Sequence, residues 1–313
     1  MSSGSDVSYI VKFSAEPSLP LSASSLGRAT GRDRQEMLRI LKTLAQRSQY
    51  TVRTLMKGRA TKMTTLWAVN ALSATSSPDL VTVIAADPNV KSIDLDTLVH
   101  APVPTLAQES AAEWNLNVTG ATSLWEQNIT GEGVVLANMD TGVDMVHPDI
   151  RRRWRRGINS WYDPNGEHSS PYDSDGHGTQ TMGIMVGGNA SGSAIGMAPD
   201  AKWIAVKIFN DAGVASISTI HQAFQWLLDP DNDINTDDAP DVINGSWGFS
   251  DLMGQCFGEF EQDIALLRLA GINISLAAGN QGPGAESSIS PANNTSGYAV
   301  GAVDDSLNVA SFS

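Results

Sequence analysis

The stretch VVLANMDTGV at residues 134–143 is an apolar, strand-forming run that ends in a carboxylate, Asp140, and then turns at Thr-Gly. Later stretches share its apolar character: AKWIAVKIF (201–209), DVINGSW (241–247), INISLAA (272–278) and YAVGAV (298–303). Nearly continuous apolar strands that alternate with helices are typical of a parallel sheet covered on both faces. The sequence from residue 115 onward therefore predicts a three-layer α/β domain.

Helical spacing of apolar residues predicts the connecting helices, at 218–228 and at 259–270. In sheets of this kind, functional residues collect at the carboxyl ends of the strands. The candidates that directly follow the predicted strands are Asp140, the loop 210–215, Ser246 and Asn280. Their spacing alone places them along one edge of the sheet.

A second motif, SDGHGTQTMG at 174–183, places His177 between two glycines at the start of a small-residue helix. A carboxylate that orients an imidazole supplies two of the three members of a nucleophilic triad, so Asp140 and His177 are the candidate catalytic pair. The third member is expected to be a serine flanked by Gly, Thr and small residues. The only Gly-Thr in residues 1–313 belongs to the histidine motif, so we expect this chain to lack the nucleophile and to be inactive alone.

Asn280 follows the apolar run LAAG and precedes QGPG. Its carboxamide could donate a hydrogen bond to a developing oxyanion, although asparagine is also common at turns. The segments Ser246-Trp247-Gly248 and Gly213-Val214-Ala215 could pair with an extended peptide, or be an ordinary strand end and loop.

Asp140 by itself allows other interpretations. An aspartate before Thr-Gly can simply cap a turn. Asp-Thr-Gly is also the motif of aspartic proteases, whose chemistry needs two carboxylates that share a proton. The sequence has no second copy of that motif, and this interpretation leaves the histidine motif unexplained.

The first third of the chain has a different pattern. It predicts strands at 8–13, 64–72 and 91–96, with helices at 33–47 and from Pro78 to Asp87-Pro88. This order suits a small α/β sandwich. The predicted organisation is a small domain over 1–100, a proline-containing linker over 101–114, and the larger domain over 115–313.

Composition narrows the class of protein. Residues 1–100 carry 12 Lys or Arg against 8 Asp or Glu, a balance of +4, whereas residues 101–313 carry 8 against 26, a balance of −18. The two parts should attract each other, and the acidity of the larger part argues against nucleic acid as a partner. Cys256 is the only cysteine, so no internal disulfide forms. Neither a membrane span nor a signal peptide is visible in the sequence.

An acidic block, DPDNDINTDDAPD at 229–241, imitates a calcium loop at Asp229, Asp231 and Asp233. It lacks the glycine and the final glutamate of that motif, so a solvated acidic loop is the favoured interpretation.

Taken in order, five motifs make the chain resemble the subtilisin-like serine proteases (peptidase family S8), and within them the bacillopeptidase F-like group. They are DTGVDMVHPD (140–149), DGHGTQTMGIMVG (175–187), AIGMAPDAKWIAVKIF (194–209), APDVINGSWG (239–248) and SLAAGNQGPG (275–284). Residues 8–96 more weakly resemble the I9-type inhibitory propeptide of these enzymes, through YIVKF and VKSIDLD. The resemblance implies a parallel-sheet catalytic domain preceded by a small ferredoxin-like α+β propeptide domain.

The resemblance also implies roles for particular residues. Asp140 would be the triad aspartate, His177 the general base and Asn280 the oxyanion-hole carboxamide. The implied substrate-binding residues are Gly213, Val214, Ala215, Ser246, Trp247, Gly248 and Gly279. No cofactor is implied for the chemistry, although Asp149 matches one ligand of the family's structural calcium site.

Two departures from the family pattern are visible. Gln180 stands where a second histidine is common. The nucleophile motif Gly-Thr-Ser-Met-Ala is expected some tens of residues after 309–313. The implied protein is a secreted, autoprocessed zymogen that cleaves protein or peptide substrates and is inhibited by its own propeptide, with cleavage in the stretch Leu95–Pro104. A non-catalytic peptide-binding or inhibitory pseudoprotease is the alternative.

Overall fold

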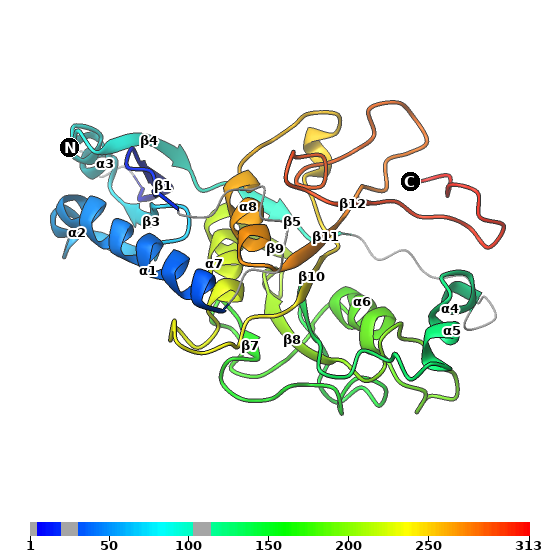
Figure 1. Cartoon of the computed structure of the whole chain (residues 1–313). Helices are drawn as coiled ribbons and strands as arrows, with labels where there is room; N and C mark the ends of the chain where they lie inside the picture. The colour runs from blue at the N-terminus through cyan, green and yellow to red at the C-terminus, as the bar shows by residue number, and fades with distance from the viewer. Residues whose placement is uncertain (1–4, 20–30, 103–113) are drawn as a thin grey trace.

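The computed structural model describes residues 5–19, 31–102 and 114–313. These residues form a small N-terminal unit around an antiparallel sheet, whose strands lie between Val7 and Leu95, and a larger unit built on a central sheet (Figure 1). Within the described ranges, no helix is both long enough and apolar enough to cross a bilayer.

The N-terminal unit is a four-stranded antiparallel sheet with the order β2-β3-β1-β4. Its strands are β1 (Val7–Phe13), β2 (Ala60–Leu66), β3 (Ala71–Ser76) and β4 (Val90–Leu95), and its helices are α1 (Gly31–Ser48), α2 (Tyr50–Met56) and α3 (Pro78–Ala85). Successive side chains of β1 point to opposite faces of the sheet and therefore enter two different hydrophobic cores. Tyr9, Val11 and Phe13 pack with residues of α2 and α3, whereas Ile10 belongs to the main hydrophobic core.

The prediction of one strand over 64–72 is wrong. The chain forms a hairpin there, and β2 and β3 are joined by a turn that ends at Asn70, whose φ is +47°. Asparagine tolerates this left-handed conformation better than most residues do. The turn sequence WAVN contains neither glycine nor proline, so nothing in it interrupts the apolar pattern. The sequence analysis also did not find α2, which follows α1 after Gln49.

The central sheet has six strands in the order β12-β11-β10-β6-β8-β7, and all its pairs are parallel, which confirms the predicted parallel sheet. The strands are β6 (Val135–Asp140), β7 (Trp161–Tyr162), β8 (Lys202–Lys207), β10 (Val242–Gly245), β11 (Asn273–Ala277) and β12 (Ala299–Val300). The run predicted as a strand over 298–303 contributes only the two residues of β12.

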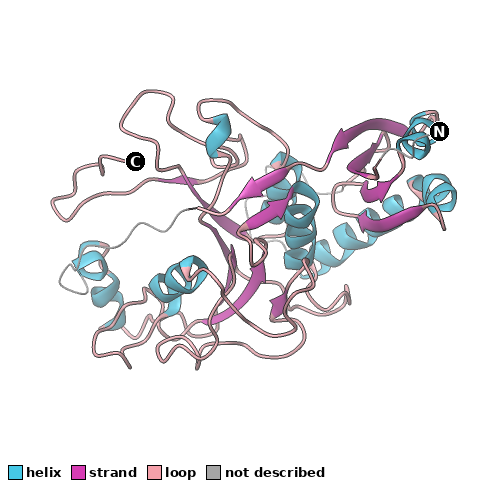
Figure 2. Cartoon of the chain, turned by 180° about the vertical axis from the view of Figure 1, so that it is seen from behind, coloured by secondary structure: helices cyan, strands magenta, loops and turns pink. Residues whose placement is uncertain are grey.

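Helices cover both faces of this sheet (Figures 1 and 2). One face carries α6 (His177–Val186), and the other carries α7 (Ile217–Leu228) and α8 (Glu261–Leu269). The shorter elements are α4 (Trp114–Val118), α5 (Ala121–Trp125), a 3₁₀ turn η1 (Ser250–Leu252), and two strands outside the main sheets, β5 (Leu98–His100) and β9 (Val214–Ser216).

Aromatic packing fixes α7 and α8 against the sheet. Phe224, Trp247 and Phe260 are all at most 1% exposed, and their ring centroids lie 5.6–6.4 Å apart. Full burial of a large apolar side chain contributes about 1.5–3 kcal/mol, so this cluster holds the sheet and both helices as one body.

Candidate active site

Asp140 is the last residue of β6, and its side chain is 1% exposed. Its Oδ1 accepts a hydrogen bond from the backbone N–H of Thr141 at 2.7 Å, and its Oδ2 accepts one from the hydroxyl of Thr181 at 3.3 Å. The carboxylate is therefore fixed at the carboxyl edge of the sheet and is shielded from water.

His177 is the first residue of α6 and follows Gly176, whose φ of +97° favours glycine. The imidazole Nδ1 lies 2.7 Å from Asp140 Oδ1, and the side chain is 14% exposed. The structure thus brings together two groups that lie 37 residues apart in the sequence. Because Asp140 holds Nδ1, the other ring nitrogen, Nε2, is the one left for a substrate or a nucleophile.

Gly178 permits the close approach of α6 to the turn after β6. A Cβ at this position would lie 2.1 Å from the carbonyl oxygen of Gly142 and 3.1 Å from the Asp140 Cβ. The second glycine of the Gly-His-Gly motif is therefore required by packing, and without it Asp140 and His177 could not approach so closely.

Asp173 organises the loop before His177, and the sequence analysis did not single it out. Its Oδ1 accepts hydrogen bonds from the Thr141 hydroxyl at 2.9 Å and the Gly176 N–H at 2.9 Å, and its Oδ2 accepts two from Thr179. Burial raises the pKa of Asp173, but the hydrogen bonds from Thr179 and Gly176 outweigh burial and leave the pKa below its usual value. The sequence signal for Asp173 is its position two residues before the Asp-Gly-His-Gly segment, because an aspartate side chain commonly accepts hydrogen bonds from the backbone of the turn that follows it.

The electrostatics of the pair follow from burial and proximity. Burial lowers the pKa of His177, but the hydrogen bond and charge of Asp140, aided by Asp175 and Asp173, outweigh it, so the pKa is raised above 6.5. Burial raises the pKa of the Asp140 carboxyl, and the hydrogen bond and charge of His177 oppose that effect. The imidazolium that forms when His177 accepts a proton is therefore stabilised by its neighbour.

Lys207 is a second residue that the sequence analysis did not single out. It ends β8 opposite Asp140, and its side chain is fully buried. Its Nζ donates to the carbonyl of Thr141 at 2.8 Å and lies 3.2 Å from Asp211 Oδ1. One buried cation thus joins the turn after Asp140 to the loop that leads into β9.

Asn280 and Gly279 follow β11, two strands away from β6 at the same edge of the sheet. Asn280 is exposed, and its backbone N–H donates to the side-chain oxygen of Gln281 at 2.9 Å. Gly279 has a φ of +125°, a conformation that favours glycine. The carboxamide is therefore accessible to a ligand at this edge.

The segment Ser246-Trp247-Gly248 follows β10, between β6 and β11 in the sheet. Ser246 exchanges hydrogen bonds with the side chain of Asn244, and the Trp247 side chain is buried in the aromatic cluster. A Cβ at Gly248 would lie 2.6–2.9 Å from Ile289 and Ser290. The side chain of Trp247 is therefore out of reach of a substrate, and this residue could contact one only through its backbone.

Residues Gly213-Val214-Ala215 are paired with another part of the same chain. In the antiparallel pair of β5 and β9, Leu98 lies opposite Ser216, Val99 opposite Ala215 and His100 opposite Val214 (Figure 1). The N–H of Ala101 donates to the carbonyl of Gly213 at 2.8 Å. Residues 98–101 thus bind to this segment in the way that an extended peptide would.

Asp149 could hold a cation. Its Oδ1 accepts the backbone N–H groups of Ala190 and Ser191, whereas its Oδ2 is buried without a hydrogen-bond partner in the described part of the chain. Burying a carboxylate oxygen without a partner costs free energy, unless a bound ion or water interacts with it. Asp149 is therefore a candidate cation ligand, in agreement with its match to one ligand of the family's structural calcium site, although the side-chain amide of the family's calcium loop is missing from this sequence.

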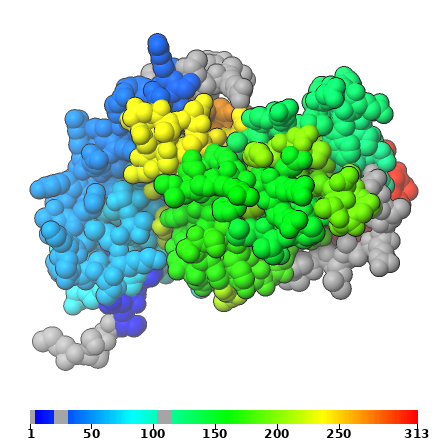
Figure 3. Space-filling model, turned by 90° about the horizontal axis from the view of Figure 1, so that it is seen from below, coloured from blue at the N-terminus to red at the C-terminus, as the bar shows by residue number. Residues whose placement is uncertain are grey.

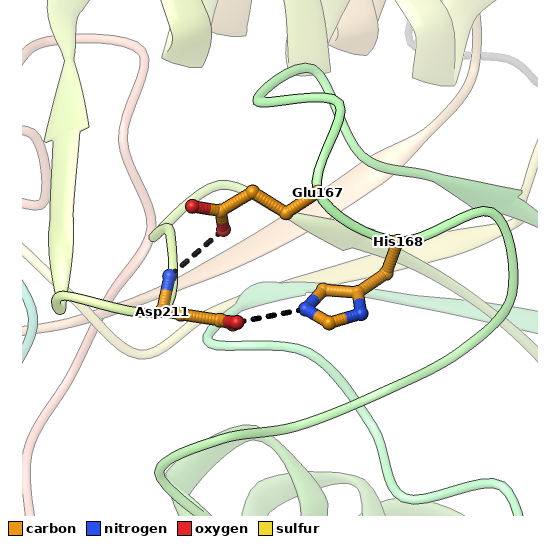
Figure 4. Close-up of side chains that lie close together, drawn as sticks. All are labelled: Glu167, His168 and Asp211. Carbon is orange, nitrogen blue, oxygen red and sulfur yellow. Dashed lines mark hydrogen bonds and ion pairs between the residues drawn. The ribbon is translucent and has the colours of Figure 1, made fainter.

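Two further groupings of acidic side chains could hold a metal ion, and each lies beside a lysine. Glu167, His168 and Asp211 lie close together in Figure 4, where the His168 ring bonds Asp211 at 2.9 Å and Glu167 accepts the Asp211 N–H. Lys207 lies beside this group. The other grouping consists of Asp229, Asp231 and Asp238. Asp233, the third acid that the sequence pattern of a calcium loop suggested, is not part of it.

Comparison with known proteins places these features in context. The profile of the Subtilase family matches residues 131–313. Bacillopeptidase F of Bacillus subtilis (strain 168) is 31% identical over 316 residues, which is 90% of this chain and 22% of that protein. Serine protease AprX of the same organism is 31% identical over 246 residues, 76% of this chain and 52% of that protein. Subtilisin E, also from that organism, is 31% identical over 248 residues, 78% of this chain and 59% of that protein. The chain thus spans less than two thirds of each of these relatives.

Proposed function

This chain belongs to the subtilase family, and from that premise we propose that it is part of a serine endopeptidase that hydrolyses peptide bonds through an acyl-enzyme. The observation that carries the proposal is the 2.7 Å hydrogen bond between buried Asp140 and His177 Nδ1, which leaves Nε2 for a nucleophile. This carboxylate–imidazole arrangement is the one that activates the serine in a Ser-His-Asp triad.

The proposed mechanism assigns one role to each group. His177 takes the proton of the nucleophilic serine and returns it to the leaving amine. Asp140 fixes the imidazole tautomer and stabilises the imidazolium. Asn280 and the backbone N–H of the serine bind the tetrahedral oxyanion. We place the serine in sequence after Ser313, since residues 1–313 contain no Gly-Thr-Ser.

We further propose that residues 1–100 are an inhibitory propeptide, residues 101–114 a linker, and residues 115–313 the start of the catalytic domain. Two observations support this. The strand order β2-β3-β1-β4, with helices inserted after β1 and β3, suits a ferredoxin-like unit. Pairing of Leu98–His100 with β9 suits an intramolecular inhibitor that enters the substrate site.

Removal of this inhibitor would require cleavage in the stretch Leu95–Pro104, of which residues 103 and 104 lie outside the described residues. Protein or peptide chains are the proposed substrates. By analogy with its relatives, the proposed site of action is outside the cell. Calcium at Asp149 is proposed as a structural ion.

The test is a peptidase assay on the complete gene product that contains these 313 residues. The activity should be abolished by phenylmethylsulfonyl fluoride, a serine reagent, and should resist pepstatin. A His177→Ala variant should lose about a millionfold in kcat, the size known for loss of this base in subtilisin. Peptide binding without hydrolysis would favour the pseudoprotease instead. Inhibition by pepstatin would favour an aspartic protease, for which no structural observation speaks because Asp140 is paired with an imidazole.

A further inference from the structure

An acidic loop, which we define as residues 229–238, joins the end of α7 to β10. Its sequence DPDNDINTDD contains five aspartates. The loop lies against the N-terminal unit in Figure 3, where its yellow surface meets the blue surface of α1. This loop contributes nothing to the Asp140–His177 pair.

Two basic residues of α1 contact this loop. Lys42 Nζ forms an ion pair with Asp229 and donates a 2.8 Å hydrogen bond to Asn232 Oδ1. Arg34 forms an ion pair with Asp237, two turns of helix earlier. Lys42 also lies 5.1 Å from the ring centroid of Trp67, which restricts its side chain. The spacing of the two cations along α1 therefore matches the spacing of the acids along the loop.

Burial makes the Lys42 contact more than a surface ion pair. The Asp229 side chain is 2% exposed and that of Lys42 is 20% exposed. A carboxylate that is shielded from water and loses its cation is strongly destabilised. In the Arg34 contact the buried partner is the base, because the Arg34 side chain is 11% exposed and that of Asp237 is 84% exposed, so the carboxylate would lose little on separation. Specific recognition should therefore depend mainly on the Lys42–Asp229 pair.

A third ion pair between the two units also has its base on the N-terminal unit and its acid on the larger unit. Lys12 of β1 donates to Glu259, 2.8 Å away, just before α8. All three contacts place the base on the N-terminal unit and the acid on the larger unit, in agreement with their balances of +4 and −18. Opposite net charges attract at long range, whereas the positions of Lys42 and Arg34 fix the orientation.

We propose that the acidic loop 229–238 is a recognition site for the basic face of α1, and that it makes occupancy of β9 by residues 98–101 sensitive to ionic strength. The partner chemistry is a basic amphipathic helix on the N-terminal unit of this same chain. This inference rests on the proposed role of that unit as an occupant of the substrate site. Screening by salt weakens the Arg34–Asp237 pair more than the Lys42–Asp229 pair, because the carboxylate of the first is exposed and that of the second is buried.

The test is hydrogen exchange with mass spectrometry on the intact 313-residue chain, from low to about 1 M NaCl, where the Debye length falls to roughly 3 Å. The variants are Lys42→Glu, Asp229→Lys and the double swap. Each single change should speed exchange in α1, in the acidic loop and in β5 by roughly threefold to tenfold, and the double swap should restore protection. Added salt should reduce the difference between the variants and the unmodified chain.

Because Asp229 is buried, its substitution could unfold the chain. The Arg34–Asp237 pair, whose carboxylate is exposed, provides a second cycle, Arg34→Glu with Asp237→Arg, for which the same pattern is expected at smaller amplitude. Lys57→Glu is the matched control: it makes the same charge change on the N-terminal unit and lies at the end of α2, away from the acidic loop. It should leave the protection of the acidic loop unchanged.

Equal effects of Lys57→Glu and Lys42→Glu, or no rescue in either double swap, would overturn the recognition site. Failure of the proposed function would look different. If β5 exchanges freely while α1 and the loop stay protected, the acidic loop binds α1 but residues 98–101 do not act as an inhibitor.

Discussion

At the scale of single residues, the site depends on a carboxylate withdrawn from water and an imidazole that stays partly accessible. Asp140 is held from three directions, by Thr141, Thr181 and His177. A charge in this environment acts on its neighbour with little screening. The protonation of His177 is therefore the property that reports most directly on Asp140.

Replacing Asp140 by Asn should lower the pKa of His177. The substitution removes the charge and weakens the hydrogen bond that raise this pKa, and burial of the ring, which lowers it, then dominates. NMR titration of the histidine resonances measures the change. His221 lies on α7, apart from Asp140, and its titration should not move. An unchanged His177 pKa would mean that the two residues are not paired in solution.

The glycines of α6 offer a second residue-scale prediction. Gly178→Ala should cost about 1–3 kcal/mol of unfolding free energy, because its Cβ would clash with the Gly142 carbonyl. Gly183→Ala in the same helix meets only Ile195 at 3.5 Å and should be neutral or stabilising by up to about 1 kcal/mol. Urea denaturation measures both, and similar values for the two variants would contradict the packing argument.

The sequence singles out Asp140 and His177 as a candidate pair because each motif combines a reactive group with the glycines that its backbone requires, and the structure places the two side chains 2.7 Å apart. It did not identify Asp173 or Lys207. Their roles depend on hydrogen bonds to Thr141 and Thr179 and on an ion pair with Asp211, and a single sequence does not show which loops come together. Likewise, the burial of Trp247 became visible only once α7 and α8 were packed on the sheet.

At the scale of elements, the two short strands β5 and β9 join the units. Val99 is 4% exposed and belongs to the main hydrophobic core, whereas its neighbour Leu98 is 64% exposed. Alternation along β5 therefore gives one anchoring side chain and one that faces solvent. The attachment of this strand should depend on Val99.

Val99→Ala should loosen β5, because two buried methyl groups are lost at roughly 0.8 kcal/mol each. Hydrogen exchange of residues 98–101 and of β9 should accelerate by about tenfold. Leu98→Ala is the matched control and should change exchange little, since its side chain is already in water. Equal acceleration by both variants would show that Val99 does not anchor the strand.

The helices α7 and α8 are joined by a buried charged cluster. His221 Nδ1 lies 2.9 Å from Asp263, and its Nε2 lies 3.2 Å from Glu259, which also bonds Lys12. Burial lowers the pKa of His221, but Asp263 and Glu259 outweigh it and raise the pKa to about 9. The protonated ring therefore bridges the two helices at neutral pH.

Protonation of His221 should stabilise the fold fully below its unfolded pKa of about 6.5, and this contribution should vanish as the pH rises to about 9. The loss should be on the order of 3 kcal/mol between these limits. Urea denaturation across this pH range should show the decline, and a His221→Gln variant should lack it. Parallel curves for the two proteins would contradict the bridging role.

At the scale of the whole molecule, the parallel sheet and its helices were predictable because apolar strands and amphipathic helices alternate with clear periods. The hairpin of β2 and β3 was not, since the turn ending at Asn70 carries no glycine or proline. Charge asymmetry predicted that the two parts attract each other. Only the folded chain shows that Lys42 and Arg34 meet the acidic loop, and that residues 98–101 pair with β9.

The most direct test of the proposed function is covalent labelling of the complete gene product with phenylmethylsulfonyl fluoride, read by mass spectrometry. We expect a single modified serine within a Gly-Thr-Ser segment, and loss of this modification in a His177→Ala variant that remains folded. Labelling of that serine at an unchanged rate in the variant, or peptidase activity with no labelled serine, would contradict it.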